Sequence, residues 1–334
     1  MSKLGFIATT IGLALVGFLL YRFTGRDAPP VVVNLTPGPA QPRVSLPEAG
    51  LDPQALEAAV AYAGTRNTRA LLVARGEHVV FEKYWEGTSA DTPVEPGFAP
   101  VLLALAVGSA MNDRLINNLD APLSNYMADA DAQLGAITIR QLLSQDAHEM
   151  TPDDSADVLA QVLERVTSQP YPQLVAERLW RPMEAGSLEF RAGDSRRRPQ
   201  GVIADCCVRA RVADWMRVGE LLAHDGVFLG NQLTPPRYVN LMLKPARKDS
   251  PRGFFTRVDG DFAAHDVAWL QGTNRQRLWI VPSLRLSILR IGDEPPSSLD
   301  WDEAMIPNSI IRGTRDWQPR AAGEGVDPGK FAPH

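Results

Sequence analysis

The sequence predicts an α+β fold in which an antiparallel β-sheet is flanked by N- and C-terminal helices and interrupted by an all-helical insertion. Strand-like runs occur near both ends of the folded part, at 69–86 and 265–291. The stretch between them, 98–243, carries apolar residues mainly at helical spacing. The order helix, strands, helices, strands, helix therefore describes one sheet with a helical block inserted into it.

The first elements have clear boundary residues. The folded domain is expected to begin at Leu51, with Asp52 as the N-cap of a helix that runs from Pro53 to about Tyr62. Two strands follow at 69–75 and 78–86, and Gly76-Glu77 between them suits a type II′ hairpin turn. These residues predict a helix that leads directly into a β-hairpin.

The middle and last elements follow from the spacing of apolar residues. Leu159, Val162, Leu163 and Val166 recur at helical intervals, which marks the buried face of one helix. The expected helices are 98–111, 138–144, 154–167, 171–180, 210–223 and 235–243. The later strands and a closing helix are expected at 265–271, 276–281, 285–291 and 300–311.

The N-terminus predicts a membrane anchor. Leu4 to Phe23 holds no charge before Arg22 and is long enough to span a bilayer as a helix. A cleaved signal peptide is the alternative, but the run is long for one and lacks a small-x-small cleavage site. We therefore expect a single-pass membrane protein whose partner is the membrane itself, with the folded domain on the extracytoplasmic, periplasmic side. The basic residues around the span are nearly balanced, so they leave its orientation open.

The composition and the absence of certain motifs exclude several classes of function. The net charge of −5 does not indicate a nucleic-acid-binding protein, because such proteins usually carry an excess of basic residues. The familiar sequence motifs of zinc sites, phosphate-binding loops and nucleophile elbows are also absent. We expect no metal and no cofactor.

A proline-rich linker is expected at 24–49 and a loose tail at 313–334. Cys206 and Cys207 are adjacent, and because a disulfide between neighbours needs a strained ring, we expect two buried free thiols.

Several segments, together with the order of elements, resemble the serine β-lactamase and penicillin-binding-protein superfamily. Within it they resemble the branch that contains class C-related β-lactamases and nylon-oligomer hydrolases. The resemblance covers 50–312 and implies a sheet part at 50–92 and 253–312, with a helical part at 93–252. The segments that carry it are 108–123, 137–144, 158–183 and 276–292.

The resemblance also locates three catalytic motifs, and this chain departs from all three. Where the family has a nucleophilic Ser followed three residues later by an activating Lys, the chain has Gly97 and Pro100. Thr151-Pro152-Asp153 stands in place of the tyrosine motif, and Thr273-Asn274-Arg275 in place of Lys-Thr-Gly. The family's small Gly lets substrate lie against a strand, so Arg275 is expected to crowd that position.

A second test of the missing nucleophile does not depend on alignment. The residues three positions before the lysines are Val80, Leu241, Pro245 and Asp327, and Lys3 lies too near the start to have one. No lysine therefore follows a Ser, Thr or Cys at this spacing anywhere in the chain.

The sequence leaves three functions to weigh. The first is a membrane-anchored pseudoenzyme that binds or scaffolds at the cell envelope, with a peptide, ester or peptidoglycan fragment as its small-molecule ligand, or with a protein partner. The second is an active esterase or amidase that uses other residues. The third is a structural subunit of a membrane complex. For the second, Asp146, His148 and Glu149 are candidate acid–base groups lining the cleft beside Gly272, although a solvated loop is the simpler interpretation.

Overall fold

The computed structural model describes residues 29–147, 150–193, 201–248 and 250–318. The predicted membrane anchor at 4–23 and most of the predicted tail lie outside these residues. Within the described ranges, no helix is both long enough and apolar enough to cross a membrane.

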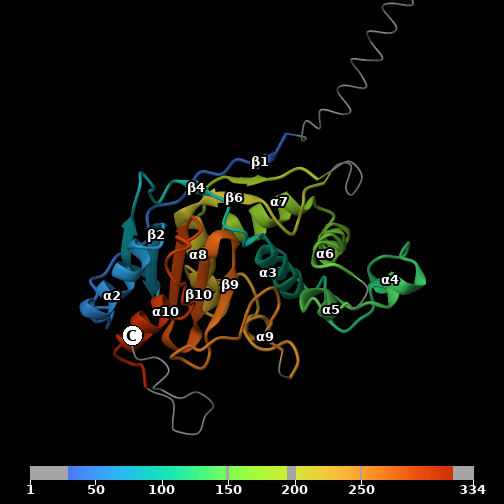
Figure 1. Ribbon diagram of the computed structural model, residues 1–334. Helices are drawn as coiled ribbons and strands as arrows, with labels where there is room; N and C mark the ends of the chain where they lie inside the picture. Colours follow the sequence, from blue (N-terminus) through green and yellow to red (C-terminus); the bar gives the residue numbers. More distant parts are fainter. Residues whose placement is uncertain (1–28, 148–149, 194–200, 249, 319–334) are drawn as a thin grey trace, which may run out of the picture.

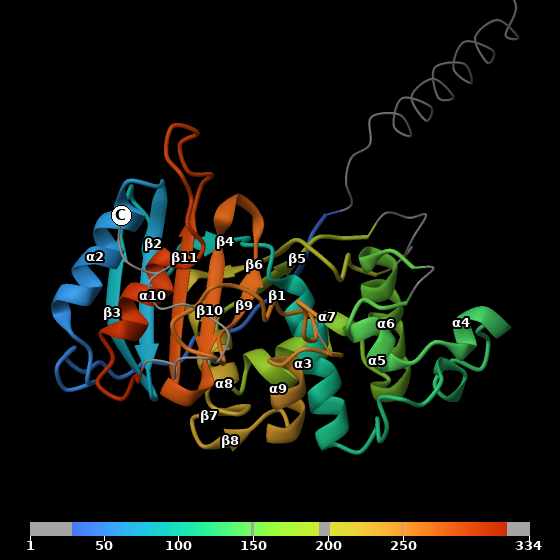
Figure 2. The same ribbon diagram turned by 60° about the horizontal axis from the view of Figure 1, so that its bottom comes forward.

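The strands expected near the two ends of the domain are confirmed, and they form one sheet. Among the described residues, five strands pair antiparallel in the order β3-β2-β11-β10-β9, and Figure 2 shows them side by side. They are β2 (Thr68–Arg75), β3 (His78–Tyr84), β9 (Ala268–Gln271), β10 (Arg277–Val281) and β11 (Leu286–Gly292). Gly76, in the turn between β2 and β3, has the positive φ that such a turn requires.

Alternation along the strands divides the sheet between two hydrophobic layers. In β2, Leu71 and Val73 pack with the helices α2 (Pro53–Gly64) and α10 (Met305–Arg312). Leu72 and Ala74 belong to the opposite layer, which includes α8 (Val212–Ala223). The sheet is therefore covered on both faces, as the expected flanking helices require (Figure 1).

The middle of the chain forms a helical layer around α3 (Ala99–Asn112), which is buried along most of its length. Its apolar residues pack against α6 (Pro152–Thr167), as the periodicity of that segment predicts. The remaining helices are α4 (Ala132–Ala136), α5 (Ile139–Leu143), α7 (Tyr171–Val175) with a π-helical continuation (Ala176–Trp180), and α9 (Pro236–Met242). Short 3-10 turns occur at Leu123–Asn125, Thr273–Arg275 and Pro282–Leu284.

The inserted part is not all-helical, which corrects the sequence prediction. Within the described ranges a second sheet has the order β1-β5-β6-β4, and a small hairpin joins β7 to β8. These strands are β1 (Val31–Val33), β4 (Pro93–Val94), β5 (Leu188–Phe190), β6 (Val208–Arg211), β7 (Val227–Phe228) and β8 (Asn231–Gln232). None exceeds four residues, so none contains enough positions to show a period-two pattern.

The proline-rich segment is likewise part of the fold over its described residues rather than a free spacer. Strand β1 pairs with β5, and the amide of Gly38 donates to the carbonyl of Glu184 at 2.9 Å. Further along, Arg43 forms a bridge to Val79 on β3. The segment is extended, as its prolines predict, but its backbone groups find partners on the domain.

Candidate functional site

A cleft of about 490 Å³ opens between the start of α3 and the end of β9. Four of the residues identified from the sequence lie in its wall: Gly97, Pro100, Gly272 and Thr273. Its other walls come from Gln145, from the segment before β6, and from the loop between α9 and β9. The lining residues from these segments are Gln145, Asp205, Cys206, Arg252, Gly253, Phe255, Thr256 and Arg257, and Gln271 lines the cleft at the end of β9.

Gly97, where the resemblance in the sequence places the family's nucleophile, lies just before Phe98, the N-cap of α3, and has a φ of +86°. A Cβ atom added there would lie 3.2 Å from the amide nitrogen of Thr273 and 3.3 Å from the Cα of Gly272. An L-amino acid adopts this backbone region only at a cost, and these contacts are tighter than ordinary ones. The position therefore favours glycine and disfavours any residue with a side chain.

The chain next to Gly97 is bonded directly to the end of β9. The amide of Thr273 donates to the carbonyl of Pro96 at 3.1 Å. This approach requires Gly272, because a Cβ there would lie 1.9 Å from the same carbonyl oxygen. Acyl-transfer sites use backbone amides beside the nucleophile to stabilise a developing oxyanion. In this protein the neighbouring amide already has a partner.

Pro100 lies in the first turn of α3, and it too lines the cleft. A proline fits there because the first amides of a helix have no intrahelical acceptor. The residues around it are apolar and buried, with Phe98 packed edge-on against Trp215 at 5.7 Å. The start of this helix contributes packing and contains no ionisable side chain.

Arg275 does not line the cleft, contrary to the crowding expected from it. Its side chain pairs with Glu294 at 3.5 Å. Asn274 and Arg275 both have positive φ, and their carbonyl groups accept hydrogen bonds from Arg290 at 3.2 and 2.7 Å. Thr273, at the start of this turn, lines the cleft, whereas Asn274 and Arg275 do not, and the amide of Thr273 is bonded to the carbonyl of Pro96.

Thr151 and Asp153, in place of the tyrosine motif, have separate roles. Thr151 is the N-cap of α6, where its Oγ1 accepts a hydrogen bond from the amide of Asp154 at 3.1 Å. Asp153 is exposed and interacts with Asp205 in the cleft wall. Burial, followed by the charge of Asp153, raises the pKa of Asp205 to about 6. Its carboxyl group therefore titrates about two pH units higher than an ordinary aspartate and is still mostly ionised at pH 7.

The loop that was expected to supply acid–base groups reaches the cleft through Gln145 rather than through Asp146. Asp146 pairs with Arg247 at 3.3 Å and does not line the wall, whereas its neighbour Gln145 does. His148 and Glu149 lie outside the described residues. The Gln145 side chain accepts a hydrogen bond from Arg252.

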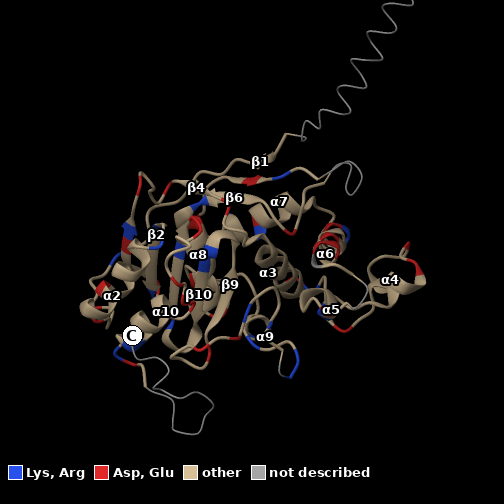
Figure 3. Cartoon of the chain, in the orientation of Figure 1, with Lys and Arg blue, Asp and Glu red and all other residues tan. Residues whose placement is uncertain are grey.

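Sequence reasoning missed Asp205, Arg252 and Arg257, which supply the charge of the cleft. Arg257 pairs with Asp259, with 2.8 Å between its Nε and a carboxylate oxygen. No local motif surrounds any of the three, so the only available signal was their residue type. Figure 3 shows acidic and basic residues interspersed over the sheet and the helices. In the described part of the chain, no group of three or more His, Cys, Asp or Glu side chains could hold a metal ion.

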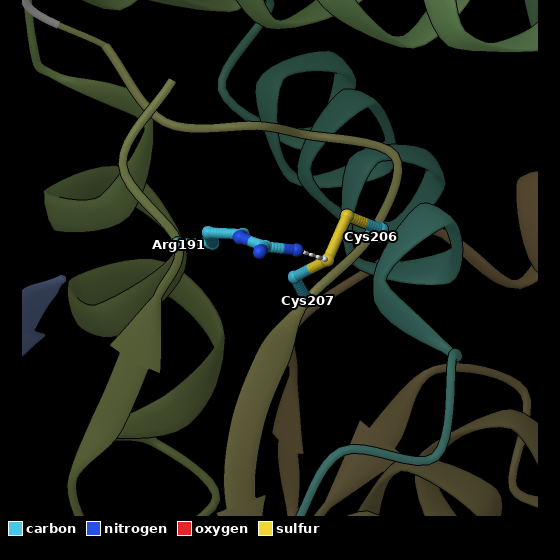
Figure 4. The surroundings of a disulfide bond; sticks show 3 residues. All are labelled: Arg191, Cys206 and Cys207. Atoms are coloured by element: carbon cyan, nitrogen blue, oxygen red, sulfur yellow. Dashed lines mark hydrogen bonds between the residues drawn. A yellow bond between two sulfur atoms is a disulfide. The ribbon is translucent and has the colours of Figure 1, made fainter. Parts of the chain in front are cut away.

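Cys206 and Cys207 form a disulfide bond, so the expectation of two free thiols is wrong. The peptide geometry accommodates the small ring with Cys207 at a φ of +66°. Cys206 lines the cleft, and the Nη1 of Arg191 donates to the Sγ of Cys207 at 3.7 Å (Figure 4). The bond therefore forms part of the cleft wall.

No family model and no curated protein matches the chain. Solved structures do match. One is a protein named as a 6-aminohexanoate-dimer hydrolase from Bacillus anthracis, with a TM-score of 0.65 and 15% identity over 85% of this chain and 90% of that one. A family VIII carboxylesterase matches with a TM-score of 0.60 and 14% identity, over 78% and 98% of the two chains. A penicillin-binding protein homologue from Caulobacter crescentus matches with a TM-score of 0.60 and 13% identity, over 77% of this chain and 94% of that one.

These likenesses agree with the resemblance found in the sequence, and they extend over both the sheet and the helical part. At such low identity they establish the architecture and leave the activity to be argued from the site. The chain therefore has the fold of the serine β-lactamase and penicillin-binding-protein superfamily.

Proposed function

We propose that this protein is a catalytically degenerate member of the fold, which uses the cleft to bind a ligand rather than to hydrolyse one. The observation that carries this proposal is the hydrogen bond from the Thr273 amide to the Pro96 carbonyl, beside Gly97. It occupies a backbone donor of the kind that would stabilise an oxyanion, at the point where the nucleophile is also missing. Catalytic groups of this kind act as a unit, so the loss of several leaves little activity.

The wall of the cleft contains charged side chains of both signs, which favours a binding role over a purely structural one. Asp205 offers a carboxyl group, and Arg252 and Arg257 offer guanidinium groups. A small peptide, an ester or a peptidoglycan fragment carries both acceptors and donors that these side chains can bind. We propose that the cleft binds ligands of this class non-covalently.

We also propose that the protein is anchored in the membrane through Leu4 to Phe23, with the domain in the periplasm. The support is the uncharged run in the sequence. Strand β1 begins at Val31, shortly after this run, so the anchor would hold the domain close to the membrane surface. Extraction of membranes with alkaline carbonate tests the anchor, since release of the full chain would contradict it. Protease access from the periplasm tests the orientation.

The catalytic part of the proposal is tested with the full chain in detergent micelles. We expect no turnover of a chromogenic cephalosporin or of nitrophenyl esters, and no labelling by fluorescent penicillin. Measurable turnover that is abolished in Asp205→Asn would overturn the proposal, as would covalent labelling by penicillin.

Restoring the missing pair is a sharper test of why activity is absent. In the double variant Gly97→Ser, Pro100→Lys we still expect no esterase activity. The Thr273 amide stays bonded to Pro96, and Thr151 and Arg275 still stand in the other two motifs. Esterase activity in this variant would show that the rest of the site is intact.

The second candidate is an active hydrolase that uses a different set of residues. The observation that favours it is the Asp205 carboxyl group in the cleft, whose pKa is raised to about 6 by burial and by Asp153. A carboxylate that titrates in this range can act as a general base toward water. Its signature would be turnover that rises through about pH 6 and disappears in Asp205→Asn.

A further inference from the structure

The two sulfur atoms of the Cys206–Cys207 disulfide have different surroundings. Cys206 lines the cleft, whereas Cys207 accepts a hydrogen bond from the guanidinium group of Arg191 at 3.7 Å. Figure 4 shows the Arg191 side chain directed at Cys207, with Cys206 at the other end of the bond. Both cysteines are half-buried, but Cys206 is the one in the cleft wall, whereas the sulfur of Cys207 lies beside a cation.

The placement of Cys207 is fixed by the second sheet. It immediately precedes β6, and the amide of Arg191, which follows β5, donates to the carbonyl of Cys207 at 3.2 Å. Arg191 therefore binds Cys207 through both its backbone and its side chain. The cation is held beside this sulfur by the pairing of two strands.

A disulfide between neighbouring residues contributes little to the stability of a fold. It closes the shortest possible loop, and in the chain-entropy model the stabilisation by a disulfide grows with the length of the loop that it closes. The neighbouring strands β5 and β6 pair through other residues, Glu189 with Arg209 and Phe190 with Val208. Opening the bond is therefore expected to leave the domain folded.

The asymmetry matches the requirements of thiol–disulfide exchange. The attacking thiolate needs access to one sulfur, and the other sulfur must leave as a thiolate. A neighbouring guanidinium group lowers the pKa of a thiol, so it makes that sulfur the better leaving group. Cys206 has the access and Cys207 has the cation.

We propose that the Cys206–Cys207 bond is a thiol-exchange site, reached through the cleft by small dithiols. A thiolate of the dithiol attacks the Sγ of Cys206, the bond between the two cysteines breaks, and the electron pair goes to the Sγ of Cys207 beside Arg191. The second thiolate of the dithiol then attacks the mixed disulfide and releases Cys206. The dithiol becomes a cyclic disulfide, and the two cysteines gain two electrons and take two protons from water. This chemistry is independent of any hydrolysis in the cleft.

The site of attack is tested on the folded, full-length protein in detergent micelles. Before reduction, a maleimide should label neither cysteine; after dithiothreitol it should label both, with the circular dichroism spectrum unchanged. With the monothiol 2-mercaptoethanol and an acid quench, peptide fragmentation should locate the adduct on Cys206. Labelling before reduction, or an adduct on Cys207, would overturn the proposal.

The role of Arg191 is tested by the rate of reduction. Arg191→Gln should slow reduction by dithiothreitol roughly tenfold, because the leaving thiolate loses its cation, and Arg191→Lys should restore most of the rate. Arg209→Gln is the matched control, since Arg209 is an exposed arginine on β6, and its rate should equal that of the native protein. Equal rates for Arg191→Gln and the native protein would refute the assignment. If Arg191→Gln fails to fold, the position of the adduct in the native protein decides.

Discussion

The two edges of the five-stranded sheet are covered by irregular segments that make contact in different ways. At the β9 edge, Arg257 pairs with Trp269 through backbone hydrogen bonds of 2.8 and 2.9 Å. Just past the end of this strand, the carbonyl of Pro96 accepts the amide of Thr273, and this approach depends on the absence of a side chain at Gly272. At the β3 edge, the amide of Val79 donates to the carbonyl of Pro42 at 3.1 Å, and ionisable side chains hold the rest of the segment. Covering an edge prevents its free backbone groups from pairing with another chain.

The contact beside β9 depends on steric fit, whereas the contacts beside β3 include buried groups that can ionise. Behind the β3 edge, α8 presents Glu220, whose carboxyl group accepts a hydrogen bond from the Gln41 side chain at 2.7 Å. On the same helix, Arg217 donates to the carbonyl of Pro39 at 3.1 Å. Burial raises the pKa of Glu220 to about 8, although the bond from Gln41 acts in the opposite direction. The β9 edge is thus sensitive to shape and the β3 edge to pH.

The largest expected effect is at the β9 edge. Gly272→Ala places a Cβ 1.9 Å from the Pro96 carbonyl oxygen, so the bond between the two segments must open. We expect the free energy of unfolding to fall by roughly 3 kcal/mol, from overpacking and from a lost hydrogen bond. Urea denaturation at several pH values measures it, and the loss should not vary with pH.

Gly64→Ala is the matched control for this substitution. An added Cβ at Gly64 meets Trp85 at 3.7 Å, which is ordinary contact. Because Gly64 ends a helix, alanine there should change stability by less than about 1 kcal/mol. Equal losses in the two variants would contradict the steric account of the β9 edge.

The next effect is at the β3 edge and depends on pH. The folded-state pKa of Glu220, about 8, is higher than its ordinary value of 4.5. The protonated group therefore stabilises the fold fully below about pH 4.5, and this contribution is lost as the pH rises to about 8. Glu220→Gln cannot ionise, so at pH 9 we expect it to be more stable than the native protein. The full shift in pKa corresponds to roughly 5 kcal/mol at about 1.4 kcal/mol per pKa unit. Because local relaxation and water penetration lower the cost of a buried charge, we expect about 2 kcal/mol of this difference to be observed.

Thermal unfolding at pH 5 and pH 9 measures this difference. At pH 5 the variant and the native protein should unfold at similar temperatures, because Glu220 is protonated in the folded state of the native protein. A variant that is equally stabilised at both pH values would show that ionisation of Glu220 is not the cause.

A smaller effect is expected at Gly97. Gly97→Ala forces an L-amino acid to adopt φ near +86° and brings a methyl group 3.2 Å from the Thr273 nitrogen. We expect a loss of about 1 kcal/mol in the free energy of unfolding, independent of pH. A stabilising effect of this variant would mean that the backbone at Gly97 is not held in this conformation, and would reopen the question of a nucleophile there.

The sequence predicts the parts of the fold that repeat a local pattern. Strand β2 alternates between two buried layers and α6 has a continuous apolar face, so both were found in nearly the right place. Strands β4 and β6 were missed because they are too short to show a period, and their pairing joins segments far apart in the chain.

Some residues of the candidate site could likewise be identified from the sequence, and others could not. Gly97 and Pro100 could be identified because their residue types exclude the expected chemistry. Asp205 could not, since packing against the start of α6, rather than any motif, brings it to Asp153. The hydrogen bond from Thr273 to Pro96 joins two backbone groups, and residue types say little about such a contact.

The smallest expected effect separates the two kinds of contact at the β3 edge itself. Arg43 pairs with Glu82, but its side chain is 65% exposed. Exposed ion pairs contribute little because water and salt screen them, so Arg43→Gln should change the free energy of unfolding by less than about 0.5 kcal/mol. Raising the salt concentration should leave this small difference unchanged or reduce it. If Arg43→Gln cost as much as the ionisation of Glu220, the surface pair rather than the buried carboxyl group would hold this edge.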